Sequence, residues 1–251
     1  MLLYNEYQLN NTNPYGTAFT AAARIQTGFS TWGIHHITDW IVRVANLSCK
    51  ASWFQKWAVH RRLRPEEFGG RVYNNLAGLT SYPIHSDLMN SQALQTALQT
   101  NGNALLPQAF VEGCPLHPSY PGGHAAAAAC ATVCKALFEE TALITNAVDS
   151  SADGLSLVPY TDTVLTQGGE LNKLAFLMGY GRDGAGIHYR TDITAGLELG
   201  EEVAICFLQD QVNTFTETFP GFSFTRFDGT PVVITPGVGP YAGMNLLTPG
   251  S

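Results

Sequence analysis

The chain has 251 residues, of which 45% are hydrophobic, and a formal net charge of −7 at pH 7. A chain of this size can bury one sizeable core or two small lobes in contact, and its acidic balance argues against nucleic acid or an anionic membrane surface as a partner. The first residues lack the basic and apolar regions of a signal peptide, and no apolar stretch is long enough to cross a bilayer. We therefore expect no membrane contact, and a reducing cytoplasm is the default compartment.

The predicted elements are mainly helices. Residues 1–32 have the composition of a loop-rich arm, and a helical pattern then runs from Gly33 to Leu63, with a possible break near Ser48 and with Pro65 as its end. Loops rich in Gly and Pro follow this helix. Further helices are expected near Ser91–Leu98 and at about 124–140, 169–180 and 191–212.

Two shorter features complete the predicted fold. Asp228–Gly229 stands between alternating segments and predicts a hairpin with a two-residue turn. Cys130 and Cys134, two of the five cysteines, lie four apart on an expected helix, which favours buried packing over a disulfide or a metal site. We predict a mainly α fold in one domain: a helical bundle with long loops over 33–215, and a small C-terminal β-hairpin with a tail over 216–251.

Basic residues are concentrated in one segment, since six of the 13 Lys and Arg residues fall between Lys50 and Arg71. Such an island in an acidic protein is a candidate pocket for a small anion, although a solvated helix face is the commoner explanation. Lys56 and Arg64 are eight apart, so a continuous helix would place them on one face. Lysine supplies a point charge, and arginine supplies a planar fork suited to two oxygens of a tetrahedral oxyanion.

The stretch "HPSYPGGHA" (residues 117–125) is a tightly punctuated loop that opens into a helix. Gly122 and Gly123 remove side-chain bulk, which allows backbone N–H groups to face an anion, and His124 stands at the head of a helix whose N-terminus favours negative charge. The alternative is an ordinary junction between a loop and a helix.

A third group of residues lies in "GRDGAGIHYRTD" (residues 181–192). Arg182 is followed after five residues by His188, and Asp192 comes four residues later, close enough on a helical turn to orient the imidazole. A surface ion pair beside a buried histidine is an equally good interpretation of this spacing alone.

Taken together, three cations and two histidines on three segments fit one tetrahedral oxyanion. The pattern resembles the superfamily of vanadium-dependent haloperoxidases and type 2 acid phosphatases, and more closely its bromoperoxidase branch of algae and cyanobacteria. The similarity rests on "WFQKWAVHRRLRPEEFGGRV", "SYPIHSD", "HPSYPGGHA", "GELNKLA" and "GIHYRTD", in this order. Family members are longer, so the chain is similar to their C-terminal catalytic half, and Gly122 replaces the serine of their Pro-Ser-Gly-His motif.

The resemblance implies a vanadate cofactor, whose site phosphate can also occupy. The residues that it implies as binding vanadate are Lys56, Arg64, Gly122, Gly123, His124, Arg182 and His188, with His188 bonded to the metal. His124, His117 and Lys56 would take part in catalysis, Asp192 would support His188, and Trp53 would line the halide entrance unless it is a core aromatic. The serine hydroxyl missing at Gly122 would cost roughly 1.5–3 kcal/mol of vanadate binding.

The implied activity is the oxidation of bromide or iodide by hydrogen peroxide to hypohalous acid, which then halogenates a small organic acceptor. The resemblance also implies a homo-oligomer. Two alternatives stay open at this point. The first is a soluble acid phosphatase that works through a phosphohistidine at His188, with His124 as general acid. The second is a degenerate homologue that binds an oxyanion without catalysis.

Overall fold

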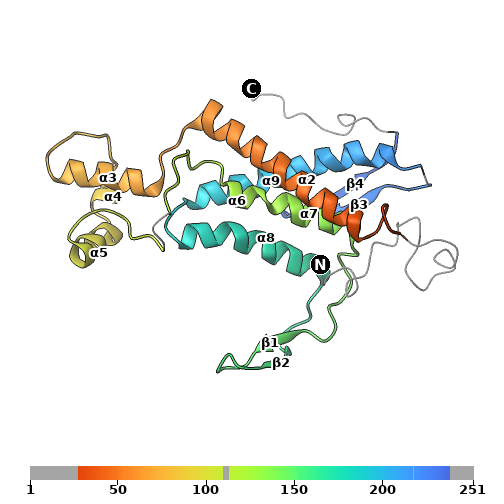
Figure 1. The fold of residues 1–251 in the computed structure, drawn as a ribbon. Coiled ribbons are helices and arrows are strands. Elements are labelled where there is room, and N and C mark those ends of the chain that lie inside the picture. The colour runs from red at the N-terminus through yellow and green to blue at the C-terminus, as the bar shows by residue number, and fades with distance from the viewer. Residues whose placement is uncertain (1–27, 110–112, 217, 238–251) are drawn as a thin grey trace.

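The computed structural model describes residues 28–109, 113–216 and 218–237. The body of the molecule is a bundle of helices that run roughly alongside one another (Figure 1). Its members are α2 (Ile34–Phe54), the short α6 (Gly123–Ala126), α7 (Ala128–Leu137), α8 (Gln167–Gly184) and α9 (Arg190–Gln211). Helix α7 packs against α2, α8 and α9. The mainly α bundle predicted from the sequence is confirmed.

Helix α2 passes through Ser48 without the predicted break. Ser48 lies on the buried face, and its hydroxyl donates to the carbonyl of Ala45 at 2.9 Å, which satisfies the polar group inside the helix. The geometry changes later, where α2 continues as the π-helix η2 (Gln55–His60). Arg61, in the left-handed region at φ 49°, ends η2. The helix therefore stops before Leu63, short of the predicted end.

A small lobe lies at one end of the bundle and contains α3 (Pro65–Leu76), α4 (Ser86–Met89) and α5 (Gln92–Asn101). A loop was predicted after Pro65, and this prediction was wrong. Proline suits the first position of a helix because the N–H that it lacks has no partner there. The lobe has a core of its own, centred on Val72 and Leu94. Helix α5 confirms the helix predicted near Ser91–Leu98.

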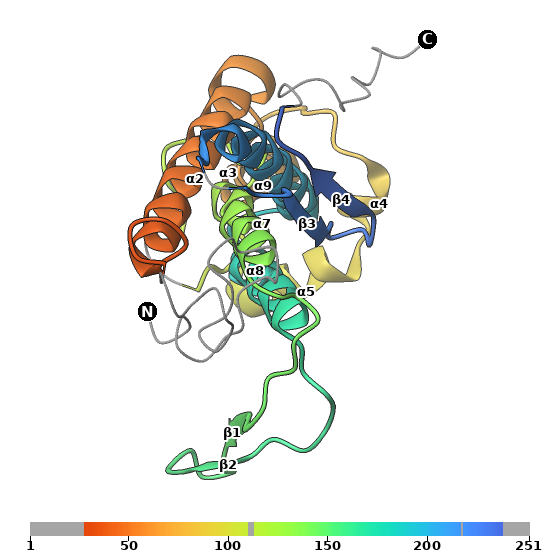
Figure 2. The ribbon, with the colours of Figure 1, turned by 90° about the vertical axis from the view of Figure 1, so that its right-hand side faces the viewer.

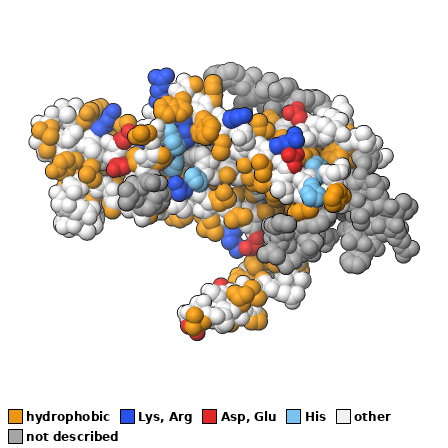
Figure 3. Space-filling view, viewed as in Figure 1, with side chains coloured by type: hydrophobic (Ala, Val, Ile, Leu, Met, Phe, Trp, Pro, Cys, Tyr) orange, Lys and Arg blue, Asp and Glu red, His pale blue; other side chains and the backbone are white. Residues whose placement is uncertain are grey.

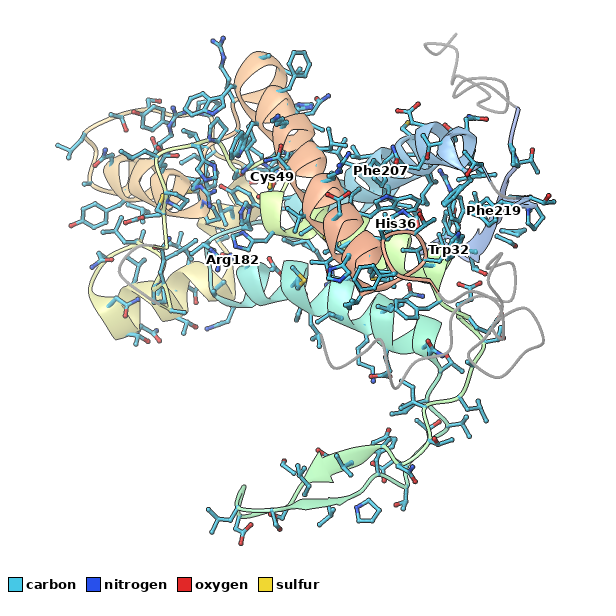
Figure 4. The ribbon with its side chains drawn as sticks, turned by 45° about the vertical axis from the view of Figure 1, so that its right-hand side comes forward. Trp32, His36, Cys49, Arg182, Phe207 and Phe219 are labelled. Atoms are coloured by element: carbon cyan, nitrogen blue, oxygen red, sulfur yellow. The ribbon has the colours of Figure 1, made fainter. Side chains whose placement is uncertain are left out.

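Aromatic side chains fill the opposite end of the bundle. Figure 4 shows Trp32, His36, Phe207 and Phe219 close together there, and Phe222 belongs to the same cluster. Around them, the segment after α9 continues through the 3-10 turn η3 (Val212–Thr214) into the C-terminal hairpin. These aromatic side chains form the core at one end of the bundle, and the lobe lies at the other end.

The C-terminal hairpin is present, with β3 (Phe222–Thr225) antiparallel to β4 (Pro231–Ile234). Its turn is longer than the predicted two residues. The N–H of Arg226 donates to the carbonyl of Thr230 at 2.8 Å, and the N–H of Gly229 donates to the carbonyl of Arg226 at 3.0 Å. Gly229 has a φ of 89°, so the loop is the three-residue kind in which glycine takes the left-handed position.

A second hairpin was not predicted. Strands β1 (Val148–Ser150) and β2 (Leu157–Pro159) pair antiparallel in an arm that stands away from the bundle (Figure 2). All six strand residues are exposed, so the arm has no buried face that could give its sequence a clear alternation.

All five cysteines are free, and Cys134 is buried in the bundle core, which agrees with a packing role. None of the helices that the structure describes is long and apolar enough to cross a membrane. The predicted division into an arm, a helical core and a tail stays a prediction, and residues 1–27 and 238–251 of that division lie outside the described residues.

Candidate oxyanion site

The three groups of residues singled out in the sequence meet where the lobe joins the bundle. Lys56 comes from η2, Arg64 precedes the first turn of α3, and His117 lies in the loop before α6. His188 lies just before α9. Figure 3 shows histidine and basic side chains gathered on the surface in this region, between the lobe and the bundle.

Lys56 and Arg64 are neighbours, but for a different reason from the one predicted. They do not share a helix face, because η2 ends at His60 and Arg64 is the N-cap of the next helix. The ring of His117 brings them together: its Nδ1 lies 3.2 Å from Lys56 Nζ and 3.3 Å from Arg64 Nη2. The π-helix turns Lys56 inward, in keeping with the frequent occurrence of π-helical turns at functional sites.

Backbone carbonyls of two loops hold the two cationic heads. Lys56 Nζ donates to the carbonyl of Pro118 at 2.7 Å. Arg64 Nε donates to the carbonyl of His117, and its Nη1 donates to the carbonyl of Ile187, both at 2.9 Å. These bonds fix both side chains without neutralising either charge.

The charges of Lys56 and Arg64 are buried, with only 1% and 2% of the residues exposed. Burial and the nearby Arg64 charge lower the pKa of Lys56 to about 8, despite the opposing effect of Asp192. Burial also lowers the pKa of Arg64. Among the described residues, no salt bridge includes either side chain. Since buried charges are costly unless paired, this donor set fits an anion with several oxygens.

His188 is held in its neutral form. Its Nδ1 lies 2.9 Å from Asp192 Oδ2, and its Nε2 lies 3.5 Å from Arg64 Nη1. Burial lowers the pKa of His188, and the bond to Asp192 opposes this shift without cancelling it. Since Asp192 accepts a hydrogen bond from the Nδ1–H group, Nε2 keeps its lone pair on the side of the cations. A histidine in this state can bind a metal or attack an electrophile.

Asp192 is completely buried, so the alternative of a surface ion pair is wrong. Its Oδ2 also accepts the N–H of Tyr189 at 3.0 Å. Burial alone would raise the pKa of Asp192, but the hydrogen bonds from His188 and the Tyr189 amide outweigh burial and bring the pKa below its ordinary value. Asp192 is therefore a charged support for His188.

The loop with Gly122 and Gly123 approaches α9 closely. The N–H of Gly122 donates to the carbonyl of Asp192 at 2.8 Å, and a Cβ at position 122 would lie 3.1 Å from that oxygen. The φ of Gly122 is −70°, which any residue adopts. Gly123 is the first residue of α6, where an N–H has no partner inside the helix, and a Cβ there would meet only Ser52 Oγ at 3.8 Å.

His124 and Arg182 complete the predicted set. His124 lies near the start of α6, directly after its first residue Gly123, and is exposed. Partial burial of the ring lowers the pKa of His124, and the positive charge of Arg182 lowers this pKa further. Arg182 lies in the last turn of α8, and Figure 4 shows it at the end of that helix nearer the lobe. Its charge also lowers the pKa of Arg64, so it acts on the same region as the other two cations.

Two findings go beyond the sequence analysis. Trp53 is 54% exposed, so its alternative role as a core aromatic is wrong. Arg62, which was not among the predicted site residues, contacts the carboxylate that supports His188: its Nη1 lies 3.0 Å from Asp192 Oδ1. No signal in the sequence indicated Arg62, because it stands beside the exposed Arg61 and nothing in the spacing distinguishes the two arginines.

The comparisons with known proteins agree with this geometry. The family described as the VCPO second helical-bundle domain matches residues 49–217. The chain is 39% identical over 217 residues to a vanadium-dependent bromoperoxidase of Ascophyllum nodosum, a match that covers 81% of this chain and 39% of that protein. It is 38% identical over 231 residues to a vanadium-dependent bromoperoxidase of Corallina officinalis, which covers 83% of this chain and 38% of that protein.

A solved structure extends the similarity to three dimensions. The homohexameric structure of the second vanadate-dependent bromoperoxidase from Ascophyllum nodosum superposes with a TM-score of 0.76 at 30% identity, covering 89% of this chain and 43% of that chain. The chain spans about two fifths of the length of the curated relatives that it matches.

Proposed function

The chain belongs to the family of the VCPO second helical-bundle domain, and from this premise we propose that it binds vanadate and acts as a vanadium-dependent bromoperoxidase. The observation that carries the proposal is the pair of buried cations without a carboxylate partner among the described residues, beside a neutral His188 held by Asp192. An oxyanion would compensate both charges, and Nε2 of His188 would supply the bond to the metal.

The residues divide the binding of vanadate between them. Lys56, Arg64 and Arg182 would hold its oxygens by charge, and the Gly123 amide would add a hydrogen bond. Nε2 of His188 would bind the metal. When bound, vanadate supplies Lewis-acid activation of hydrogen peroxide toward a halide.

His124 is suited to proton transfer. Its lowered pKa keeps the imidazole neutral at neutral pH, and its exposed position allows it to accept a proton from an incoming peroxide. His117 has a different part. Burial and the neighbouring Lys56 lower the pKa of His117 to about 4, so its ring stays neutral, and its Nδ1 lies within hydrogen-bond distance of both cations and of the Pro118 carbonyl oxygen. His117 would thus keep Lys56 and Arg64 aligned.

The proposed substrates are hydrogen peroxide and bromide or iodide, with a small organic molecule as halogen acceptor. Trp53, exposed three residues before Lys56, is proposed to line the entrance for the halide. We also propose a homo-oligomer, since exposed apolar side chains such as Phe54 and Trp57 would be covered by association. Light scattering over a range of concentrations tests this, and a stable monomer throughout contradicts it.

The decisive experiment titrates orthovanadate into the protein and into His188→Ala by calorimetry. We expect the wild type to bind and to oxidise bromide with hydrogen peroxide, and the variant to lose both. His85→Ala is the matched control, because that histidine is highly exposed in the lobe and should change neither result. Hydrolysis of a phosphate ester without halide oxidation would instead support the phosphatase, and binding without either activity would support the degenerate homologue.

A further inference from the structure

Arg62 joins three segments that surround the site. Its Nη1 donates to Asp192 Oδ1 at 3.0 Å and to Thr191 Oγ1 at 2.6 Å. Its guanidinium carbon lies 4.2 Å from the centre of the Tyr189 ring. Its carbonyl accepts the N–H of Ser119 at 3.0 Å, which ties the same residue to the loop before α6.

The two oxygens of Asp192 have separate tasks. Oδ2 accepts from His188 Nδ1 and from the Tyr189 amide, whereas Oδ1 accepts from Arg62. The hydroxyl of Ser119 also lies beside Asp192, where a hydrogen bond from it helps to lower the pKa of this carboxyl, but it carries no charge. Arg62 is therefore the charged partner of Oδ1. A fully buried carboxylate needs such a partner to keep both its charge and its orientation.

We propose that Arg62 is a positioning residue. By holding Oδ1 of Asp192, it aims Oδ2 at His188, fixes the proton of that imidazole on Nδ1, and leaves the Nε2 lone pair facing the cations. This inference rests on the proposed function insofar as Nε2 is the ligand of the metal.

The geometry explains why arginine stands at this position. A planar guanidinium can lie over the Tyr189 ring and donate in its plane to two acceptors, Thr191 and Asp192, at once. A lysine ammonium keeps the charge but lacks the plane, so it cannot reproduce the stacked arrangement with both donors aligned. Partners that orient a metal-binding histidine in this way commonly change metal affinity about tenfold to a hundredfold when they are removed.

The test compares the wild type with Arg62→Met and Arg62→Lys. The matched control is Arg61→Met, because Arg61 is the adjacent arginine, is exposed, and donates from Nε to the carbonyl of Trp57 without touching Asp192. The first readout is the imidazole 15N spectrum of the ligand-free protein, labelled at histidine, with the His188 signals assigned from His188→Gln. The second is the dissociation constant of orthovanadate measured by calorimetry.

We expect the wild type and Arg61→Met to show His188 protonated at Nδ1 alone. Arg62→Met should show a mixture of the two tautomers and should bind vanadate about tenfold to a hundredfold more weakly. Arg62→Lys should fall between them. A single Nδ1–H tautomer together with wild-type affinity in Arg62→Met would overturn the proposal. If Arg62→Met does not fold, the same pair of results in Arg62→Lys would overturn it.

The two readouts separate this proposal from the proposed function. If the wild type binds no vanadate, the bromoperoxidase assignment fails, while the 15N spectrum still tests whether Arg62 sets the tautomer of His188. If the wild type binds vanadate and the tautomer is unchanged in both Arg62 variants, the positioning role fails alone.

Discussion

Glycine is favoured at position 122 by a close packing contact and not by the conformation of the backbone. Its φ of −70° is open to every amino acid, so the backbone does not require glycine there. The requirement comes from the neighbouring helix, since an added Cβ would lie 3.1 Å from the carbonyl of Asp192, tighter than an ordinary contact. A serine at this position would also have that carbonyl as an acceptor for its hydroxyl. The hydroxyl would therefore be shared between α9 and an oxyanion.

We predict different effects for Gly122→Ser and Gly122→Ala. Both should lower the free energy of unfolding by about 1 kcal/mol, because the loop has to move slightly away from α9. The serine variant should nevertheless bind vanadate up to about tenfold more tightly than the alanine variant, since only its hydroxyl can bond to the anion. Calorimetric titration of both variants measures this difference. Equal affinities would show that the loop does not present residue 122 to the anion.

At the scale of helices, α9 depends on glycine for its close contact with α6 and α7. A Cβ at Gly200 would clash with the carbonyl oxygen of Ala126 and would lie 3.0 Å from the amide nitrogen of Ala129. A Cβ at Gly196 would lie 2.6 Å from the Cβ of Ala125. The site depends on this contact, because α9 carries Asp192 while α6 carries His124.

We predict that Gly200→Ala destabilises the protein by about 1–3 kcal/mol through overpacking, and that it weakens vanadate binding as well. Gly70→Ala is the control. Gly70 lies inside α3 with no atom within 4 Å of its added Cβ, so alanine there should stabilise the protein by about 0.5–1 kcal/mol. Urea unfolding of both variants gives the comparison. A loss of stability in Gly70→Ala as large as in Gly200→Ala would contradict the packing argument.

The sequence predicted some helices correctly and missed others, because periodicity and end signals are read together. Helix α2 buries residues spaced three and four apart, from Ile37 to Ser52, and this period was visible. Helix α3 was missed because Pro65 was taken as an end signal, whereas it is the first residue of a helix. The β1–β2 arm has no buried face to give it a pattern.

The site shows the same division. The spacing from His188 to Asp192 predicted a local contact, and that contact is present. The pairing of Lys56 with Arg64 was expected for the wrong reason, because a π-helical turn and a left-handed Arg61 cannot be recognised from periodicity. Arg62 was missed because its partner, Asp192, lies 130 positions away in the chain.

At the scale of the whole molecule, an acidic chain buries two neighbouring positive charges that have no carboxylate partner among the described residues. The net charge is −7, yet Lys56 and Arg64 are buried side by side with neutral histidines around them. Protonation of these histidines is unfavourable, since each added charge would lie near the existing cations in a partly buried site. Acidification should therefore change both the free energy of unfolding and the affinity of the site for an anion.

The histidines determine the sign of this effect. Burial and the neighbouring cations lower the pKa of His117 to about 4, and the pKa values of His124 and His188 are also lowered. In the unfolded chain, these groups titrate near their ordinary value of about 6.5. Between the two values the unfolded state binds more protons than the folded state, so the free energy of unfolding rises with pH in this window. The three histidines therefore contribute fully to the free energy of unfolding above a pH of about 6.5, and this contribution is lost as the pH falls toward 4. Glu201 acts in the opposite sense, because burial raises its pKa.

We predict that the ligand-free protein loses stability between pH of about 6.5 and 4, and that His117→Asn reduces this loss. Asparagine can still accept a bond from Lys56 or Arg64 through its carbonyl oxygen, but it does not titrate. Since His117 is only half-buried, its pKa shift is discounted for solvent, and the variant should retain about 1–2 kcal/mol more of its neutral-pH stability at the acid end. Urea unfolding of both proteins at several pH values gives the slopes. Parallel slopes would mean that His117 has an ordinary pKa in the folded protein, and the ring would then be open to water instead of enclosed between Lys56 and Arg64.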